Sequence, residues 1–536
     1  MMGKEDVAII FNNKTITYEQ LKVQVLYCIG ELKKRKIVNG VVGIMLSRSP
    51  EYIYWVMAVL ISGYAFVPVN VHDDEEKRKY ISANSNMDFC IVDSDYKNIN
   101  SFEQEKFDFE LPDLDIDKIL SNESKLAYIM YTSGTTGLPK GVMISRGAFK
   151  NFIKNFLNNE IKRNDIILAN TTFTFDISLL EIVLSLTRGA TVFLTSDSEQ
   201  KNPKAMVNIL RNNIFDWVQF TPSYLNMLIG YAQNTDIFIN VKNMIVGGEN
   251  ISNALVCLLK EKICCNLYNA YGPTEATIWT HIGNLRDSFV NVGKPIACVE
   301  EYILDSKGNK SNEGMLWLGG DTLALGYINN NLLTEKKFKQ YNGHAIYETG
   351  DLVCKKNGKL VILGRVDNQV KISGKRIELE DIECKIVEST GILQCSVLYE
   401  KGELILCVDN KELKLNELRG KIINKLDAEF IPKKIFYLEK YPLLPNGKIN
   451  RKRMEEMYME QYDTNGKILE VIKEFVVCDF NNNSKLKELG ISSLEYIELV
   501  VKLEKIFNIE FEECTLMIDY FKTISDLVNY VCSKSN

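Results

Sequence analysis

The stretch that decides the fold is Tyr131-Thr132-Ser133-Gly134-Thr135-Thr136-Gly137-Leu138-Pro139-Lys140-Gly141. Apolar runs at 126–130 and 142–144 flank it, so the pattern predicts a loop between two buried strands. Glycines let the backbone N–H groups of such a loop approach a ligand closely, and the hydroxyls and Lys140 add donors that suit phosphate oxygens. The stretch lacks the spacing G-x-x-x-x-G-K-[ST] of a P-loop. A plain polar turn requires neither five hydroxyls nor a lysine, so we interpret the stretch as a phosphate-binding loop of another type.

The composition is typical of a globular protein with several domains. The chain has 536 residues, too many for one core, and 46% of them are hydrophobic. A net charge of −6 provides no basic surface for nucleic acid, and no apolar run or N-terminal segment predicts a membrane span or a signal peptide. The thirteen cysteines form no C-x-x-C pair, so we expect reduced thiols and a cytoplasmic location.

Apolar periodicity predicts the domain organisation. Helical patterns at 19–34 and 52–62 alternate with strand patterns at 41–46 and 63–70, which favours a parallel sheet covered by helices. Much later, the polar residues 456–466 end in Asp-Thr-Asn-Gly, and we interpret them as a linker. The amphipathic segments that follow predict a small all-α bundle.

The phosphate-binding loop resembles that of the adenylate-forming enzymes, and in particular that of the adenylation domains of nonribosomal peptide synthetases. Four further strings resemble motifs of this family: Asn269-Ala270-Tyr271-Gly272-Pro273-Thr274-Glu275, Tyr347-Glu348-Thr349-Gly350-Asp351-Leu352, Gly364-Arg365-Val366-Asp367 and Pro445-Asn446-Gly447-Lys448. The resemblance implies an α/β large lobe of packed sheets and helices over 1–366, a hinge at Asp367, and a small α+β lobe over 367–455. It also implies ATP and Mg²⁺ as cofactors.

The resemblance implies a role for each matched residue. Tyr271 offers a flat face on which adenine stacks, Asp351 accepts the ribose hydroxyls, and Glu275 offers a hard oxygen ligand to Mg²⁺. The implied catalytic residues are Lys448, which contacts the substrate carboxylate and the α-phosphate, together with Glu275 and Thr132. The implied nucleotide contacts are Thr132, Ser133, Gly134, Thr135, Thr136, Lys140, Gly248, Asn269, Ala270, Tyr271, Thr274, Asp351 and Arg365.

Asp176 has two interpretations. It lies between Phe175 and Ile177 at the start of an apolar helical pattern, where the residues alone favour a helix N-cap. A buried carboxylate is costly unless it is paired, so a substrate ammonium would also complete it. The resemblance favours this second interpretation, because F-D-x-S matches the family motif whose Asp binds the α-amino group of an amino acid.

Alignment of the motifs implies a set of positions that select the amino acid. They are Asp176, Ile177, Leu180, Gln219, Ile245, Gly247, Ala270, Ile278 and Trp279, closed by Lys448. The set resembles the pattern of glycine-activating domains, and bulky Leu180, Ile278 and Trp279 would fill the space that a side chain needs. We therefore expect glycine. The alternatives are alanine or a small non-standard amino acid, an acyl-CoA ligase that uses free CoA, and a scaffold without activity.

Residues 467–536 resemble a peptidyl carrier protein, a four-helix bundle. The string Leu489-Gly490-Ile491-Ser492-Ser493-Leu494 places a phosphopantetheine-bearing serine at Ser493, although the motif usually has Asp where this chain has Ser492. The residues alone also fit a capping box of Ser492 with Glu495. The resemblance implies 4'-phosphopantetheine on Ser493, a phosphopantetheinyl transferase that attaches it, and a condensation or other acceptor enzyme in trans, since we recognise neither a condensation nor a thioesterase segment.

Overall fold

The computed structural model divides the chain into two compact units, Met1–Cys384 and Lys385–Asn536, which we describe separately. It describes all residues except 1–5, 94–113, 133–138, 159, 252, 366–368, 373–374, 391, 393–394, 401, 410–413, 424, 443–448, 477–479, 482–483, 508, 518–519 and 536. The ten cysteines whose side chains the structure describes are free thiols. None of the helices in the described parts of the chain combines the length and apolarity that a membrane-spanning helix requires.

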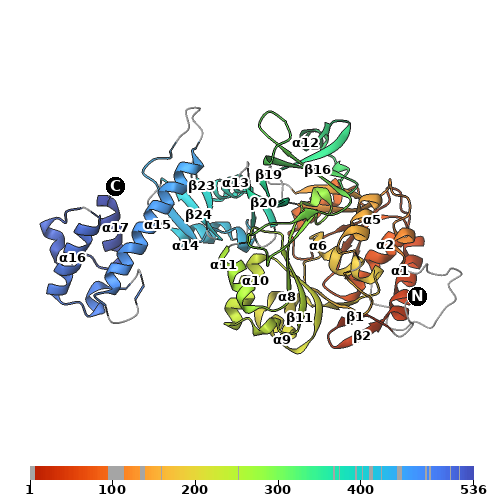
Figure 1. The fold of residues 1–536 in the computed structure, drawn as a ribbon, viewed down its shortest axis with the longest axis horizontal. Helices are drawn as coiled ribbons and strands as arrows, with labels where there is room; N and C mark the ends of the chain where they lie inside the picture. The colour runs from red at the N-terminus through yellow and green to blue at the C-terminus, as the bar shows by residue number, and fades with distance from the viewer. Residues whose placement is uncertain are drawn as a thin grey trace. The chain divides into compact units, whose positions relative to one another are not determined.

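Three large sheets and one two-stranded hairpin make up the described strands of the first unit (Figure 1). The nine-stranded sheet has the order β14 (Lys294–Pro295), β13 (His281–Asn284), β12 (Asn266–Tyr271), β11 (Val241–Gly247), β10 (Phe215–Phe220), β8 (Ile166–Ala169), β9 (Thr191–Leu194), β1 (Val7–Phe11) and β2 (Lys14–Thr17). The six-stranded sheet has the order β17 (Gly326–Tyr327), β7 (Lys140–Ser145), β6 (Leu126–Thr132), β4 (Ala65–Pro68), β3 (Val41–Met45) and β5 (Phe89–Val92). The five-stranded sheet has the order β15 (Val299–Leu304), β16 (Glu313–Gly320), β19 (His344–Lys356) and β18 (Phe338–Tyr341), with β20 (Lys359–Arg365) also paired to β19.

Helices connect the strands of the two larger sheets, as the alternating pattern predicts. They are α1 (Tyr18–Lys33), α2 (Pro50–Ile61), α3 (Glu75–Asn84), α4 (Ile116–Ile119), α5 (Arg146–Asn155), α6 (Ile177–Leu179), α7 (Ser185–Thr187), α8 (Asp197–Lys201), α9 (Pro203–Asn212), α10 (Pro222–Ala232), α11 (Asn253–Lys262) and, outside those sheets, α12 (Asn331–Lys337) and α13 (Leu379–Thr390). A hairpin of β21 (Gln369–Ile372) and β22 (Lys375–Glu378) precedes α13. The expectation of an α/β large lobe is confirmed.

Parallel pairing places the ends of three strands at one edge of the nine-stranded sheet. β10 pairs with β11 so that Gln219 lies opposite Ile245, and β11 pairs with β12 so that Gly247 lies opposite Ala270. The carboxyl ends of parallel strands are where α/β sheets bind ligands. Four pocket positions predicted from three separate strings therefore become neighbours through strand register alone.

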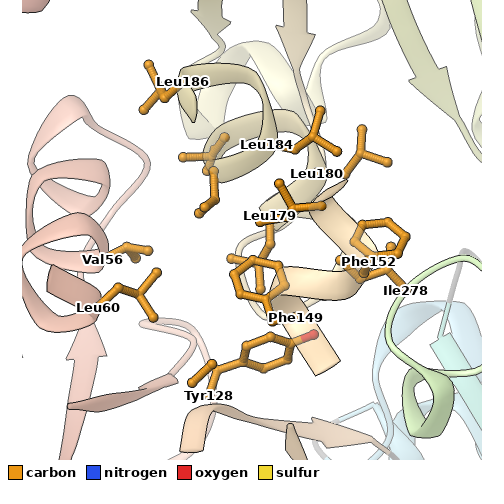
Figure 2. Packing of buried hydrophobic residues seen from close by; sticks show 14 of the residues in the cluster. Val56, Leu60, Tyr128, Phe149, Phe152, Leu179, Leu180, Leu184, Leu186 and Ile278 are labelled. Carbon is orange, nitrogen blue, oxygen red and sulfur yellow. The ribbon is translucent and has the colours of Figure 1, made fainter. Parts of the chain in front are cut away.

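A shared apolar core fixes the chain just after Asp176. Figure 2 shows buried side chains from α2, β6, α5 and the helical segment 177–187 packed in one cluster, with Ile278 at its side. The labelled members are Val56, Leu60, Tyr128, Phe149, Phe152, Leu179, Leu180, Leu184, Leu186 and Ile278. Each fully buried side chain of this size contributes about 1.5–3 kcal/mol, so the segment has little freedom to move.

The second unit contains a small three-stranded sheet and a helical bundle. The sheet consists of β23 (Ser396–Glu400), β24 (Glu403–Val408) and β25 (Lys434–Tyr437), with α14 (Leu415–Ile422) between β24 and β25. The bundle consists of the end of α15 (Arg451–Lys473), α16 (Ser493–Phe507) and α17 (Ile524–Ser535), with 3₁₀ turns at Leu486–Leu489 and Glu513–Leu516. The predicted all-α bundle is confirmed. Within its described residues, each of the two segments between the long helices contains a 3₁₀ turn.

The predicted linker at 456–466 does not form a break, because α15 runs through it as one helix. Gly466 in a helix interior costs about 1 kcal/mol relative to Ala, which is the signal that predicted an interruption. Packing at both ends outweighs that cost: Met454 is buried against the three-stranded sheet, and Ile468 and Ile472 are buried in the bundle. Tertiary contacts therefore decide the local structure here.

Candidate active site

Trp279 fills the space at the strand ends. Its indole Nε1–H donates a hydrogen bond of 3.0 Å to Oε1 of Gln219. A Cβ atom added to Gly247 would lie 2.9 Å from Cη2 of Trp279 and 2.5 Å from the carbonyl oxygen of Ala270. Glycine at 247 is thus what allows the indole to lie against the strand, and the indole leaves little room beside it.

A strained turn delivers Trp279 to this position. Thr277 and Ile278 both have left-handed backbones, with φ of 62° and 65°, which a β-branched residue adopts only at a cost. The hydroxyl of Thr277 donates to the carbonyl of Thr322 at 2.6 Å, and the N–H of Thr280 donates to the carbonyl of Tyr271 at 2.8 Å. These two bonds hold the turn, and the motif gave no local sign of its strain.

Asp176 is buried, with 6% of its surface exposed. It directly precedes α6, yet its side chain makes no capping hydrogen bond, so the capping role that the residues alone favour is not seen. Its charge acts on Tyr128: burial raises the pKa of the Tyr128 hydroxyl well above its usual value, and nearby Asp176 raises it further. The carboxylate is therefore inside the protein and close to Tyr128, which belongs to the core cluster of Figure 2.

Two polar groups, one close to Asp176 and one on the predicted pocket residue Gln219, are buried without a hydrogen-bond partner among the described residues. They are the hydroxyl of Tyr128 and Nε2 of Gln219. Buried polar atoms are nearly always bonded, so such atoms mark a place where a ligand or water completes the structure. Leu180, Ile245, Ala270 and Ile278 are also buried in the same apolar cluster.

Tyr271, Asp351 and Arg365 form a second group. The hydroxyl of Tyr271 donates to Oδ2 of Asp351, and Nη1 of Arg365 donates to Oδ1 at 2.7 Å. Arg365 also donates to the carbonyl of Thr349 at 3.0 Å. A carboxylate accepts about four hydrogen bonds, so Asp351 keeps capacity for a diol such as ribose. These bonds also fix the ring of Tyr271, and burial raises the pKa of its hydroxyl well above the usual value.

Glu275 forms a third group and is only 1% exposed. The hydroxyl of Tyr327 donates to its Oε1 at 2.7 Å, and Nζ of Lys140 lies 4.0 Å from the same oxygen. In the register of the two strands, Lys140 on β7 lies opposite Thr132 on β6. The hydroxyl of Thr132 is buried with no described hydrogen-bond partner. A carboxylate, an ammonium and a hydroxyl thus gather at the base of the phosphate-binding loop.

This chemistry fits Mg²⁺ and phosphate. In the described part of the chain, no three Asp, Glu, His or Cys side chains gather into a metal cage. Mg²⁺ usually takes one or two protein carboxylates and completes its shell with water and substrate phosphate oxygens. Glu275 would supply the carboxylate, and Lys140 with Thr132 would supply donors to phosphate.

The other predicted site residues have different placements. Ser133, Gly134, Thr135, Thr136, Asp367 and Lys448 lie outside the described residues. Asn269 donates from Nδ2 to the carbonyl of Asn291 at 3.0 Å, so its amide holds a neighbouring loop. Gly248 has a left-handed backbone with φ of 87°, and Thr274 begins a 3₁₀ turn that also contains Glu275. Ile177 lies within 3.8 Å of where a Cβ on Gly248 would stand, so these two predicted positions are neighbours.

Ser493 is exposed and is the first residue of α16. The capping box is made by its neighbour: the N–H of Glu495 donates to the hydroxyl of Ser492 at 3.3 Å, and the N–H of Ser492 donates to Glu495 at 2.8 Å. Ser492 therefore caps the start of α16, a position at which Ser and Asp are both favoured. Its presence keeps the helix start intact and leaves Ser493 at the surface.

Comparison with known proteins identifies the families of the two modules. Residues 2–328 match the family described as AMP-binding enzyme, and residues 467–531 match the phosphopantetheine attachment site. Zwittermicin A synthase ZmaJ of Bacillus cereus is 31% identical over 496 residues, which cover 85% of this chain and 93% of that protein. Bacitracin synthase 3 of Bacillus licheniformis is 30% identical over 84% of this chain, which spans only 7% of that longer protein.

Among solved structures, the Vibrio cholerae adenylation domain AlmE in complex with glycyl-adenosine-5'-phosphate superposes with a TM-score of 0.72. The identity is 21%, and the match covers 84% of this chain and 95% of that chain. At this identity the comparison supports the fold.

The packing of the turn at Gly272 generates a stability prediction. A Cβ atom there would lie 2.4 Å from the carbonyl oxygen of Ile278 and 2.7 Å from Cα of Trp279, so Gly272→Ala must displace backbone. We expect a loss of roughly 2 kcal/mol of unfolding free energy, measured by urea denaturation of the full chain.

Gly230→Ala is the matched control. Gly230 is exposed in α10 and meets nothing within 4 Å, so this change should stabilise the chain by about 0.5–1 kcal/mol. Equal effects of the two changes would contradict the packing.

Proposed function

Because the chain belongs to the AMP-binding enzyme family and carries a phosphopantetheine attachment module, we propose that it activates glycine as glycyl-AMP and loads it as a thioester on its own carrier arm. It is an AMP-forming ligase of that family. ATP and Mg²⁺ are the cofactors of the ligase module, and 4'-phosphopantetheine is the prosthetic group of the carrier module.

The observation that carries the amino acid proposal is the burial of Asp176 without a capping role. A buried carboxylate is stable only when a positive charge or several hydrogen bonds compensate for lost water. The ammonium of an amino acid supplies such a charge, and fatty or aromatic acids without an amino group do not. Tyr128, whose hydroxyl is affected by the charge of Asp176, and Gln219, which binds Trp279, each have a buried polar atom that no described residue satisfies.

The choice of glycine follows from the space around this carboxylate. The hydrogen bond to Gln219 fixes the indole of Trp279, and Gly247 allows it to lie on the strand end. Leu180 and Ile278 are almost completely buried in the adjoining cluster. Forcing extra carbons into a packed site costs about 1–3 kcal/mol, and glycine has no side chain to accommodate. The match to AlmE, solved with glycyl-adenosine-5'-phosphate, is consistent with this choice.

The residues of the chain position the reactants and neutralise charge. Tyr271, Asp351 and Arg365 would hold the nucleoside, and Glu275 would hold Mg²⁺ with Lys140 close by. When bound, Mg²⁺ and ATP supply an electrophilic α-phosphorus with its negative charge partly neutralised. We propose that Lys448 places a further positive charge at the reacting carboxylate and α-phosphate, since catalysis of such a transfer depends on positioning and electrostatic stabilisation.

The second step requires the carrier. We propose that the small lobe turns about Asp367, as hinges do at a few loop residues, and admits the thiol of the arm on Ser493. A phosphopantetheinyl transferase must first attach this arm. The glycyl thioester would then pass to a condensation or other acceptor enzyme in trans.

Glycine selection is tested by ATP–pyrophosphate exchange with single amino acids. The wild-type protein should exchange best with glycine. Trp279→Leu should raise the exchange with alanine or valine relative to glycine by about tenfold, because a pocket change of this size is worth about 1–3 kcal/mol. Trp317→Leu, on the five-stranded sheet, is the matched control and should leave the preference unchanged. Wild-type exchange with valine or phenylalanine that equals exchange with glycine would rule out the proposed substrate.

Carrier loading is tested by intact mass after treatment with a phosphopantetheinyl transferase, CoA, ATP and glycine. The wild-type chain should gain the arm and then a glycyl group, whereas Ser493→Ala should gain neither. Ser492→Ala is the matched control: it should still be loaded, with a loss of about 1 kcal/mol of carrier stability from the missing cap. Loading of Ser493→Ala would refute the assignment. Transfer of glycine to free CoA with Ser493 unmodified would establish a CoA ligase instead.

A further inference from the structure

A buried carboxylate outside the pocket closes the segment that carries Asp176. Glu181, 1% exposed, accepts hydrogen bonds from the N–H of Thr171 at 2.9 Å and from the Thr171 hydroxyl. Residues 171 and 181 are therefore joined by hydrogen bonds, and Asp176 is the middle one of the nine residues between them. None of the motifs in the sequence marks Glu181 or Thr171.

Arg48, 6% exposed, holds the same residue by its backbone carbonyl. Its Nη1 donates to the carbonyl of Thr171 at 2.5 Å, and its Nη2 donates to the carbonyl of Ala169 at 2.7 Å. Its guanidinium also lies over the ring of Phe173, 4.5 Å from the centroid, and Phe173 stacks on Tyr52. The N–H and the carbonyl of Thr171 are thus both held by buried charged side chains.

An irregular helical turn places a predicted pocket residue and the residue that binds Thr171 next to each other in the chain. Leu180–Leu184 form a π-helical turn, and π turns are frequent at functional sites. Leu180, a predicted pocket residue, and Glu181, which binds Thr171, are consecutive and both buried. The hydroxyl of Ser185 donates to the carbonyl of Leu180 at 3.3 Å, which satisfies a carbonyl in the altered turn.

We propose that Glu181 and Arg48 are positioning residues that set the place of Asp176 by holding the N–H and the carbonyl of Thr171. The proposal rests on the proposed role of Asp176 in binding the amino group. Neither residue touches the substrate, and both act through the segment 171–181. The energetic reason is that two buried charges are retained only when their geometry is good, and here both converge on one residue.

The first test is Glu181→Gln in the full-length holo protein. Glutamine keeps the size and one acceptor oxygen but loses the charge. Burial raises the pKa of Glu181 to about 7, so assays at pH 8 keep the wild-type carboxylate ionised. We expect the KM for glycine to rise about tenfold, with kcat and the KM for ATP within about twofold of wild type, because only the amino-group contact is displaced.

A second readout separates positioning from general damage. Glycolate has the carboxylate of glycine but a hydroxyl in place of the amino group, so it does not depend on Asp176 for charge. The ratio of kcat/KM for glycine to that for glycolate should fall about tenfold in Glu181→Gln. A mainly structural residue would lower both values equally and leave the ratio unchanged. Thr171→Val, which removes only the hydroxyl donor, should shift the ratio in the same direction and keeps the test available if Glu181→Gln does not fold.

Asp216→Asn is the matched control. Asp216 is also a buried carboxylate that accepts a backbone hydrogen bond, from the N–H of Ile166 at 2.8 Å, but it lies at the start of β10, away from Gln219. It should lower stability without changing the ratio. If the wild-type protein does not prefer glycine to glycolate, the proposed role of Asp176 fails. If it does and neither Glu181→Gln nor Thr171→Val changes the preference, the positioning inference alone fails.

Discussion

The burial of one carboxylate, Asp176, is the constraint on which the rest of the site depends. A carboxylate at 6% exposure loses most of its hydration, so the fold must hold it in one place and compensate it with a positive charge or with hydrogen bonds. In our proposal, the ammonium of the substrate supplies such a charge. Apolar packing of Leu179 and Leu180 fixes the chain after it, and the bonds to Thr171 fix the chain before it. In the same proposal, the indole of Trp279 limits the size of the side chain that the bound amino acid can carry.

The remaining parts of the site depend on how the two large sheets are joined. Glu275 follows the last parallel strand of the nine-stranded sheet, while Lys140 and Tyr327 belong to the six-stranded sheet. The segment 324–328 connects them: the N–H of Ala324 donates to the carbonyl of Glu275 at 2.9 Å, and the N–H of Leu325 donates to the carbonyl of Met143 at 2.8 Å. The groups that would hold metal and phosphate are therefore fixed to each other across the sheets.

The sequence predicts the parts of this arrangement that local pattern determines. The strands around the phosphate-binding loop, the helix at Ser493 with its capping box at Ser492, and the alternation of strands and helices all follow from short-range rules. The residues alone favoured a cap for Asp176, because short-range rules cannot show that the side chain turns inward. Likewise a glycine at 466 predicts a break, and only packing at both ends of α15 explains its absence.

The contacts that local sequence patterns do not predict join residues that lie far apart in the chain. Tyr327 reaches Glu275 across 52 positions, and Arg48 reaches Thr171 across 123. Tyr271 and Arg365 both bond to Asp351, which the sequence presents only as a ribose acceptor. Such bonds depend on the register of sheets, so a single sequence gives no direct signal for them.

The most direct measurement of the central claim is ATP–pyrophosphate exchange by Asp176→Asn. Asparagine keeps the shape of the side chain and removes its charge, and loss of a buried charge partner costs about 2–5 kcal/mol. The account predicts that exchange with glycine falls by about 100-fold or more while ATP binding, measured separately, is retained. Glycine-dependent exchange at the wild-type level in Asp176→Asn would contradict it.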